Sequence, residues 1–119
     1  MKKFNSYEAF LDDLEEKTGY QVFDQRTDAN GVKTPYIVAQ RISNDDILAD
    51  NQCLLKRDQI ALNLHAYQKN RDSNGEKVKA EKKIEDYLMS VGSIFDRDDD
   101  WLDNIQLYVI TYGFEVMYE

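Results

Sequence analysis

The sequence predicts an α+β fold in which an antiparallel β-sheet of about four to five strands is flanked by two helices. Helical and strand patterns occur in separate runs, which favours helices packed on one face of an antiparallel sheet. The chain has 119 residues, and 42% of them are hydrophobic. This length can bury a core of its own, so residues 1–119 are expected to form a single domain.

The first predicted element is an amphipathic helix over residues 5–18. Asn5 is expected to cap it, with Glu8 three residues later as in a capping box. Gly19 is a typical residue at a helix end. Its apolar residues follow the helical i, i+3, i+4, i+7 spacing; they are Tyr7, Phe10, Leu11 and Leu14.

Two short strands are predicted next, at residues 20–25 and 34–42. The Asn30-Gly31 dipeptide between them is a strong hairpin signal, so the two strands are expected to pair as a hairpin. Residues 43–57 then form a connection that is long for a compact domain. Long connections are often functional or carry part of an interface.

A strand over residues 58–68 follows, with Ile60, Leu62, Leu64 and Ala66 facing inward. After a polar turn, a second helix is expected to begin with a capping box of Ser73 and Glu76. Its apolar stripe consists of Ala80, Ile84, Tyr87, Leu88 and Val91. Residues 93–102 are predicted to form a short strand and an acidic bend.

The final segment, residues 105–118, is the most informative part of the chain. A strand points alternate side chains to opposite faces. Its apolar row at a spacing of two is Tyr108, Ile110, Tyr112, Phe114, Val116 and Tyr118. The pattern predicts a long strand that presents a continuous apolar face to the core.

Charge and cysteine content narrow the possible functions. The formal net charge is −8, which argues against binding to a phosphate backbone. Four basic residues of the second helix, Lys77, Lys79, Lys82 and Lys83, alternate with acidic residues, so salt bridges within the helix explain them. A single cysteine, no secretory signal and no membrane-length apolar run indicate a protein that stays in the cytosol or leaves it inside a larger assembly.

No catalytic motif is present, so the chain is not expected to be an enzyme or to hold a cofactor. His65 is the only histidine and Cys53 the only thiol, and no Cys–His signature surrounds them. The Asp96-x-Asp98-x-Asp100 run matches the start of a calcium loop. Trp101 then stands where the loop needs Gly, and Leu107 stands where it needs Glu. A solvated acidic turn is therefore favoured over an ion site.

Taken together, the elements resemble the tail terminator proteins (tail completion, or tail-to-head joining) of long-tailed bacteriophages and prophages. The resemblance runs from residue 34 to the end, and such proteins also open with a short acidic helix. The segments that carry it are Pro35-Tyr36-Ile37-Val38, Arg41-Ile42-Ser43, Ala49-Asp50-Asn51, Asp58-Gln59-Ile60-Ala61-Leu62-Asn63-Leu64 and Tyr112-Gly113-Phe114-Glu115-Val116.

The resemblance implies a structural virion protein that forms a ring, typically a hexamer, in the tail or neck of the phage. This homo-oligomer would cap the tail tube, stop its polymerisation and dock to the head–tail connector protein. DNA would pass through the lumen without specific binding, no membrane would be involved, and assembly would take place in the cytoplasm of the bacterial host.

A ring needs a head-to-tail interface that closes by rotation. The candidate interface residues are Ile47, Leu48, Leu54, Leu55 and Trp101. Trp101 is expected either to anchor a partner or to cover the edge of the core. The alternative function is a small acidic cytosolic binding protein, similar to immunity proteins or antitoxins, that masks a basic partner with Trp101 and the acids of residues 96–103. A third interpretation, a metal-dependent enzyme, is supported by the aspartate run alone.

Overall fold

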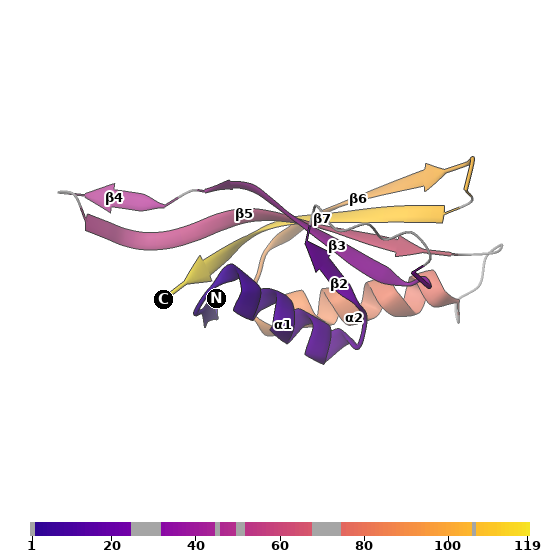
Figure 1. Ribbon diagram of the computed structural model, residues 1–119, viewed down its shortest axis with the longest axis horizontal. Helices are drawn as coiled ribbons and strands as arrows, with labels where there is room; N and C mark the ends of the chain where they lie inside the picture. The colour runs from indigo at the N-terminus through magenta and orange to yellow at the C-terminus, as the bar shows by residue number, and fades with distance from the viewer. Residues whose placement is uncertain (1, 25–31, 45, 50–51, 68–74, 106) are drawn as a thin grey trace.

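Two helices lie on one face of a mixed β-sheet (Figure 1). A computed structural model describes residues 2–24, 32–44, 46–49, 52–67, 75–105 and 107–119, and describes the backbone alone at 47–49 and 52–54. The predicted α+β class is therefore confirmed. Neither helix in these ranges has the length and apolar character that crossing a membrane requires.

The sheet is larger than predicted. The helices are α1 (Tyr7–Thr18) and α2 (Glu76–Ser90). The strands are β1 (Lys3–Phe4), β2 (Val22–Asp24), β3 (Tyr36–Asn44), β4 (Ile47–Ala49), β5 (Gln52–Ala66), β6 (Phe95–Leu102) and β7 (Leu107–Tyr118). Their order is β1-β7-β5-β3-β2, with β4 paired to β5 and β6 paired to β7. Within the described ranges the sheet thus has seven strands, not four to five.

The prediction of a purely antiparallel sheet is wrong, because β1 runs parallel to β7 and β2 runs parallel to β3. The predicted hairpin between residues 20–25 and 34–42 is wrong for the same reason, because a hairpin would make β2 and β3 antiparallel. Residues 25–35 separate β2 from β3, which is close to the dozen residues that a parallel crossover needs. The Asn30-Gly31 signal lies outside the described residues.

The long terminal strand is confirmed as β7, which pairs with β5 from Tyr108 to Tyr118. Its predicted inward row faces the helices, and Ile110, Tyr112, Phe114 and Val116 are buried. The inward row of β5 is also confirmed. We call the side of the sheet that packs on α1 and α2 the helix face, and the opposite side the open face.

Both helices have the predicted apolar stripes, but their caps differ from prediction. Ser6, not Asn5, caps α1, because the Ala9 N–H donates to Ser6 Oγ at 3.1 Å. Gly19 ends α1 with a φ of 77°, a left-handed conformation that glycine adopts without strain. The N-cap of α2 is Gly75, without a side-chain cap. The predicted cap residue Ser73 lies outside the described residues.

The segment predicted as a long connection contains strands, and the segment predicted as a short strand with an acidic bend is one longer strand. Residues 43–57 contain the end of β3, all of β4 and the start of β5. Apolar residues such as Ile47 are as compatible with strand pairing as with a loop at an interface. Residues 95–102 form β6 although five of its eight residues are charged. Pairing with β7 along the whole of β6 outweighs the low strand propensity of aspartate.

Candidate assembly interface

The β4–β5 hairpin projects beyond the body of the molecule, and we call its strands, residues 47–49 and 52–55, the arm (Figure 1). Pairing between β5 and β7 ends at Lys56 opposite Tyr118, so within the described chain β4 is the only strand beside the arm part of β5. A two-stranded hairpin is at best marginally stable alone in water. An additional strand or contact surface from another chain would therefore stabilise the arm.

The structure places four of the five predicted interface residues in the arm. Ile47 lies opposite Leu55 in the ladder, Leu48 lies opposite Cys53, and Leu54 lies between them on β5. Trp101 lies elsewhere, on β6. Its ring packs on Tyr108, with ring centroids 4.6 Å apart, and 39% of the residue is exposed. This packing matches a cover over the core edge, while the anchor role stays a prediction.

A buried carboxylate fixes the point where the arm leaves the body, which we call the arm root. Asp58 is 1% exposed and accepts from Arg41 Nε at 3.0 Å, from Asn44 Nδ2 at 3.1 Å and from the Tyr118 hydroxyl at 2.7 Å. Burial, with this hydrogen bond to Asp58, raises the pKa of Tyr118, so its hydroxyl stays a donor. A buried charge must be paired in this way.

Further hydrogen bonds hold the β3–β4 junction at the arm root. Asp46 accepts from the Arg57 N–H at 2.9 Å and from Asn44 Nδ2 at 3.2 Å. On the open face, Glu115 accepts from Gln59 Nε2 at 2.8 Å and pairs with Arg57 at 3.4 Å. The arm is thus attached to the body by directional bonds from three strands. Sequence reasoning missed Asp58, although its place in the inward row of β5 was a signal of burial.

The open face carries an aromatic cluster at one end. The rings of Tyr36 and His65 stack 4.6 Å apart, and Phe23 meets Tyr36 edge-on at 6.1 Å. Burial lowers the pKa of His65, so the ring is neutral when stacked. His65 lies twelve positions after Cys53 on the same strand, which is about 40 Å of extended chain. The two therefore do not form a catalytic pair.

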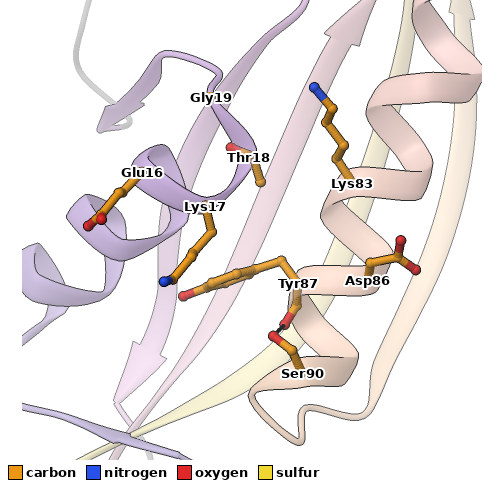
Figure 2. Close-up of a pocket in the computed structure, with 8 residues that line it drawn as sticks. All are labelled: Glu16, Lys17, Thr18, Gly19, Lys83, Asp86, Tyr87 and Ser90. Carbon is orange, nitrogen blue, oxygen red and sulfur yellow. Dashed lines mark hydrogen bonds between the residues drawn. The ribbon is translucent and has the colours of Figure 1, made fainter.

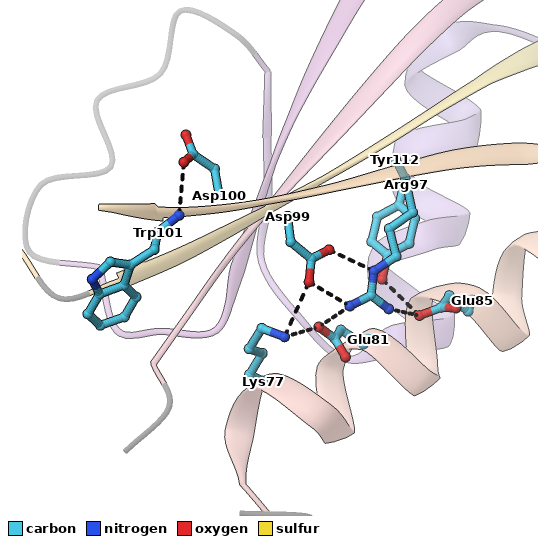
Figure 3. A network of polar contacts seen from close by, with 8 residues as sticks. All are labelled: Lys77, Glu81, Glu85, Arg97, Asp99, Asp100, Trp101 and Tyr112. Atoms are coloured by element: carbon cyan, nitrogen blue, oxygen red, sulfur yellow. Dashed lines mark hydrogen bonds and ion pairs between the residues drawn. The ribbon is translucent and has the colours of Figure 1, made fainter. Parts of the chain in front are cut away.

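On the helix face, β6 is tied to α2 by an ion-pair network (Figure 3). Arg97 donates from Nε to Asp99 at 2.8 Å, from one terminal nitrogen to Glu81 at 2.7 Å and from the other to Glu85 at 3.0 Å. Lys77 binds Glu81 and lies 3.6 Å from Asp99. The hydrogen bonds to Asp99 raise the pKa of Arg97 and lower the pKa of Asp99.

The remaining aspartates of β6 are exposed. Figure 3 shows Asp100 pointing to the opposite side of β6 from Asp99, and Asp96 and Asp98 share the side of Asp100 by strand alternation. An extended strand spaces such residues about 6.7 Å apart, so they do not converge on one ion as calcium ligands do. Among the described residues, no group of three or more His, Cys, Asp or Glu could hold a metal.

The predicted salt bridges of α2 are confirmed by the pairs Lys77–Glu81 and Lys82–Asp86.

A cavity of about 460 Å³ lies between the end of α1 and α2 (Figure 2), and it is lined by Glu16, Lys17, Thr18, Gly19, Lys83, Asp86, Tyr87 and Ser90. Two of its polar groups already have protein partners, since the Tyr87 hydroxyl donates to Asp13 and Ser90 Oγ donates to the Tyr87 carbonyl. The cavity therefore does not present a prepared ligand site.

Comparison with protein-family models finds no family that matches the chain, and comparison with curated proteins finds no match either. The resemblance to tail terminators thus rests on the sequence. What the geometry adds is a candidate interface, the arm, with a hydrogen-bonded root.

Proposed function

We propose that this chain is a structural protein of the tail terminator type, which assembles head to tail into a ring, typically a hexamer. The ring caps the phage tail tube, stops its polymerisation and forms the docking surface for the head–tail connector protein. The observation that carries the proposal is the arm, whose two strands have no charged residue and no third strand beside them in the described chain. A strand from a neighbouring subunit would extend this two-stranded ladder.

The charge of the chain agrees with a lumen that DNA crosses without binding. Each subunit contributes a formal net charge of −8, and six subunits would repel a duplex of like charge. This repulsion is screened beyond about 8 Å at physiological salt, so it would guide the DNA without blocking it. A ring with a basic lumen would contradict this part of the proposal.

Solution mass tests the ring directly. Light scattering behind size exclusion should give about six times the 14.0 kDa subunit mass. A variant in which Asn-Gly replaces residues 47–55 should keep the body folded, because that turn closes a two-residue hairpin, and should be a monomer. An arm-less variant that still forms the ring would overturn the role of the arm.

Tube capping tests the function itself. When added to polymerising tail tube protein from the same phage, the chain should limit tube length in electron micrographs, and the arm-less variant should not. Tubes of unchanged length would contradict the terminator proposal. The outer acids of β6 instead favour the alternative of an immunity-like protein, which would appear as a one-to-one complex with a basic partner.

A further inference from the structure

A small cavity, the edge notch, lies where the sheet edge beside β7 is interrupted. β6 pairs with β7 only as far as Phe114, and β1 joins β7 only from Met117. Glu115 and Val116 therefore lie between the ends of two edge strands. The notch has a volume of about 270 Å³ and is lined by Gly92, Ser93, Ile94, Glu115 and Met117.

The size and chemistry of the edge notch suit a protein side chain. Small-molecule sites usually span about 300–1,000 Å³, so this cavity is smaller than a typical ligand pocket. Ile94 on its rim is 94% exposed. Glu115 is the one charged lining residue, and its carboxylate is already held by Arg57 and Gln59. The notch thus offers an apolar surface without a free charge.

Ser93 gives the edge notch an unmet polar group. The residue is 9% exposed, and its Oγ is the one buried side-chain nitrogen or oxygen atom among the described residues without a hydrogen-bond partner. A buried hydroxyl without a partner is costly, and such a group in a native fold calls for an explanation. A backbone group from a docked segment would supply the partner after rotation about the Ser93 Cα–Cβ bond.

The arm has matching requirements. Its strands read Ile-Leu-Ala and Gln-Cys-Leu-Leu and have no charged residue, while Asp50 stands between them in the sequence and 32% of the whole chain is charged. Copies that each carry a net charge of −8 repel one another, so contact between them favours uncharged patches of this kind.

We propose that the edge notch is the receptor for the arm of a second copy of this chain. The arm docks at the notch beside Ile94, and a backbone group of the arm pairs with the Ser93 hydroxyl. The two surfaces are different, so the contact is heterologous and repeats from copy to copy until a ring closes. This inference rests on the proposed ring and names its interface.

Mixed disulfide formation tests the contact, because Cys53 lies in the arm and is the only native cysteine. The native chain is mixed with a tagged C53S/I94C variant and oxidised mildly. A disulfide needs Cβ atoms about 3.5–4.5 Å apart, so a mixed dimer should form in preference to both homodimers. The matched control is C53S/I105C, because Ile105 is also exposed, at 55%, and lies at the β6–β7 turn.

The outcomes separate this inference from the proposed function. A mixed dimer with the thiol at position 94 and not at position 105 supports it. Equal dimer yields at both positions, or a ring by light scattering without any dimer through position 94, overturns the inference and leaves the ring standing. A monomer at every concentration with no mixed dimer overturns both.

Ser93→Ala gives a second readout that does not depend on cysteine chemistry. If the hydroxyl is bonded only in the assembly, the variant should weaken self-association by about 2- to 10-fold. Its thermal melting as a dilute monomer should be unchanged or higher, because an unpaired buried hydroxyl has been removed. Unchanged self-association would remove the hydrogen bond from the proposed contact.

Discussion

Two charged clusters connect elements of this fold, and they differ in how much water reaches them. At the arm root, the carboxylate of Asp58 is 1% exposed and pairs with Arg41, whose own side chain is 52% exposed. On β6, Arg97 binds three carboxylates, yet Asp99 is 41% exposed and Arg97 itself is 32% exposed. Exposed ion pairs contribute little to the free energy of unfolding, whereas a buried charge that loses its partner lowers it strongly. The cluster with fewer ion pairs should therefore matter more for stability.

Removing the arginine of each cluster tests this comparison with the largest expected effect. Arg41→Ala leaves Asp58 buried with only the neutral donors Asn44 and Tyr118, so it should lower the free energy of unfolding by about 3 kcal/mol. Arg97→Ala should cost about 1 kcal/mol, because water reaches its partners. Urea unfolding measures both, and equal losses would show that exposure does not separate the clusters.

Two tyrosine hydroxyls on β7 sharpen the comparison at the level of single hydrogen bonds. Tyr118 donates to Asp58 at 2.7 Å, and Tyr112 donates to Glu85 at 3.0 Å. Burial raises the pKa of both tyrosines, so each remains a donor at neutral pH. Tyr118→Phe should cost about 1–2 kcal/mol in urea unfolding. Tyr112→Phe should cost less, because Glu85 is 28% exposed and water can replace the hydroxyl; the reverse order would refute the argument.

The sequence could predict features that depend on a local pattern, but not those that depend on contacts between distant segments. The alternation in β7 and the stripe of α2 identified buried residues, because periodicity depends on which side faces the core. Strand direction does not leave such a pattern, so the parallel pairing of β2 with β3 was missed. Asn5 and Ser6 both cap helices well, and the sequence does not rank two such neighbours.

The candidate interface was only partly predictable for a related reason. Apolar residues in 43–57 correctly indicated an unusual segment, but the ladder that forms the arm depends on β4 meeting β5. The acidic run of β6 has low strand propensity, and it is held by partners distant in sequence, which are β7 and, through Arg97, Glu85 of α2. The edge notch depends on where β1 and β6 end, which only the assembled sheet determines.

Acid titration gives the smallest expected effect. The hydrogen bond from Arg97 holds the pKa of Asp99 below its usual value of 3.8. Because the folded chain favours the ionised form, this stabilisation is present above pH 3.8 and is lost as the pH falls through the lower folded value. Solvent screening at a side chain that is 41% exposed should limit it to a few tenths of a kcal/mol. Asp99→Asn should therefore cost this amount at about pH 6 and less at about pH 3. In an Arg97→Ala background, the cost of Asp99→Asn should be smaller at both pH values. An unchanged cost in that background would mean that Arg97 is not the source of the stabilisation.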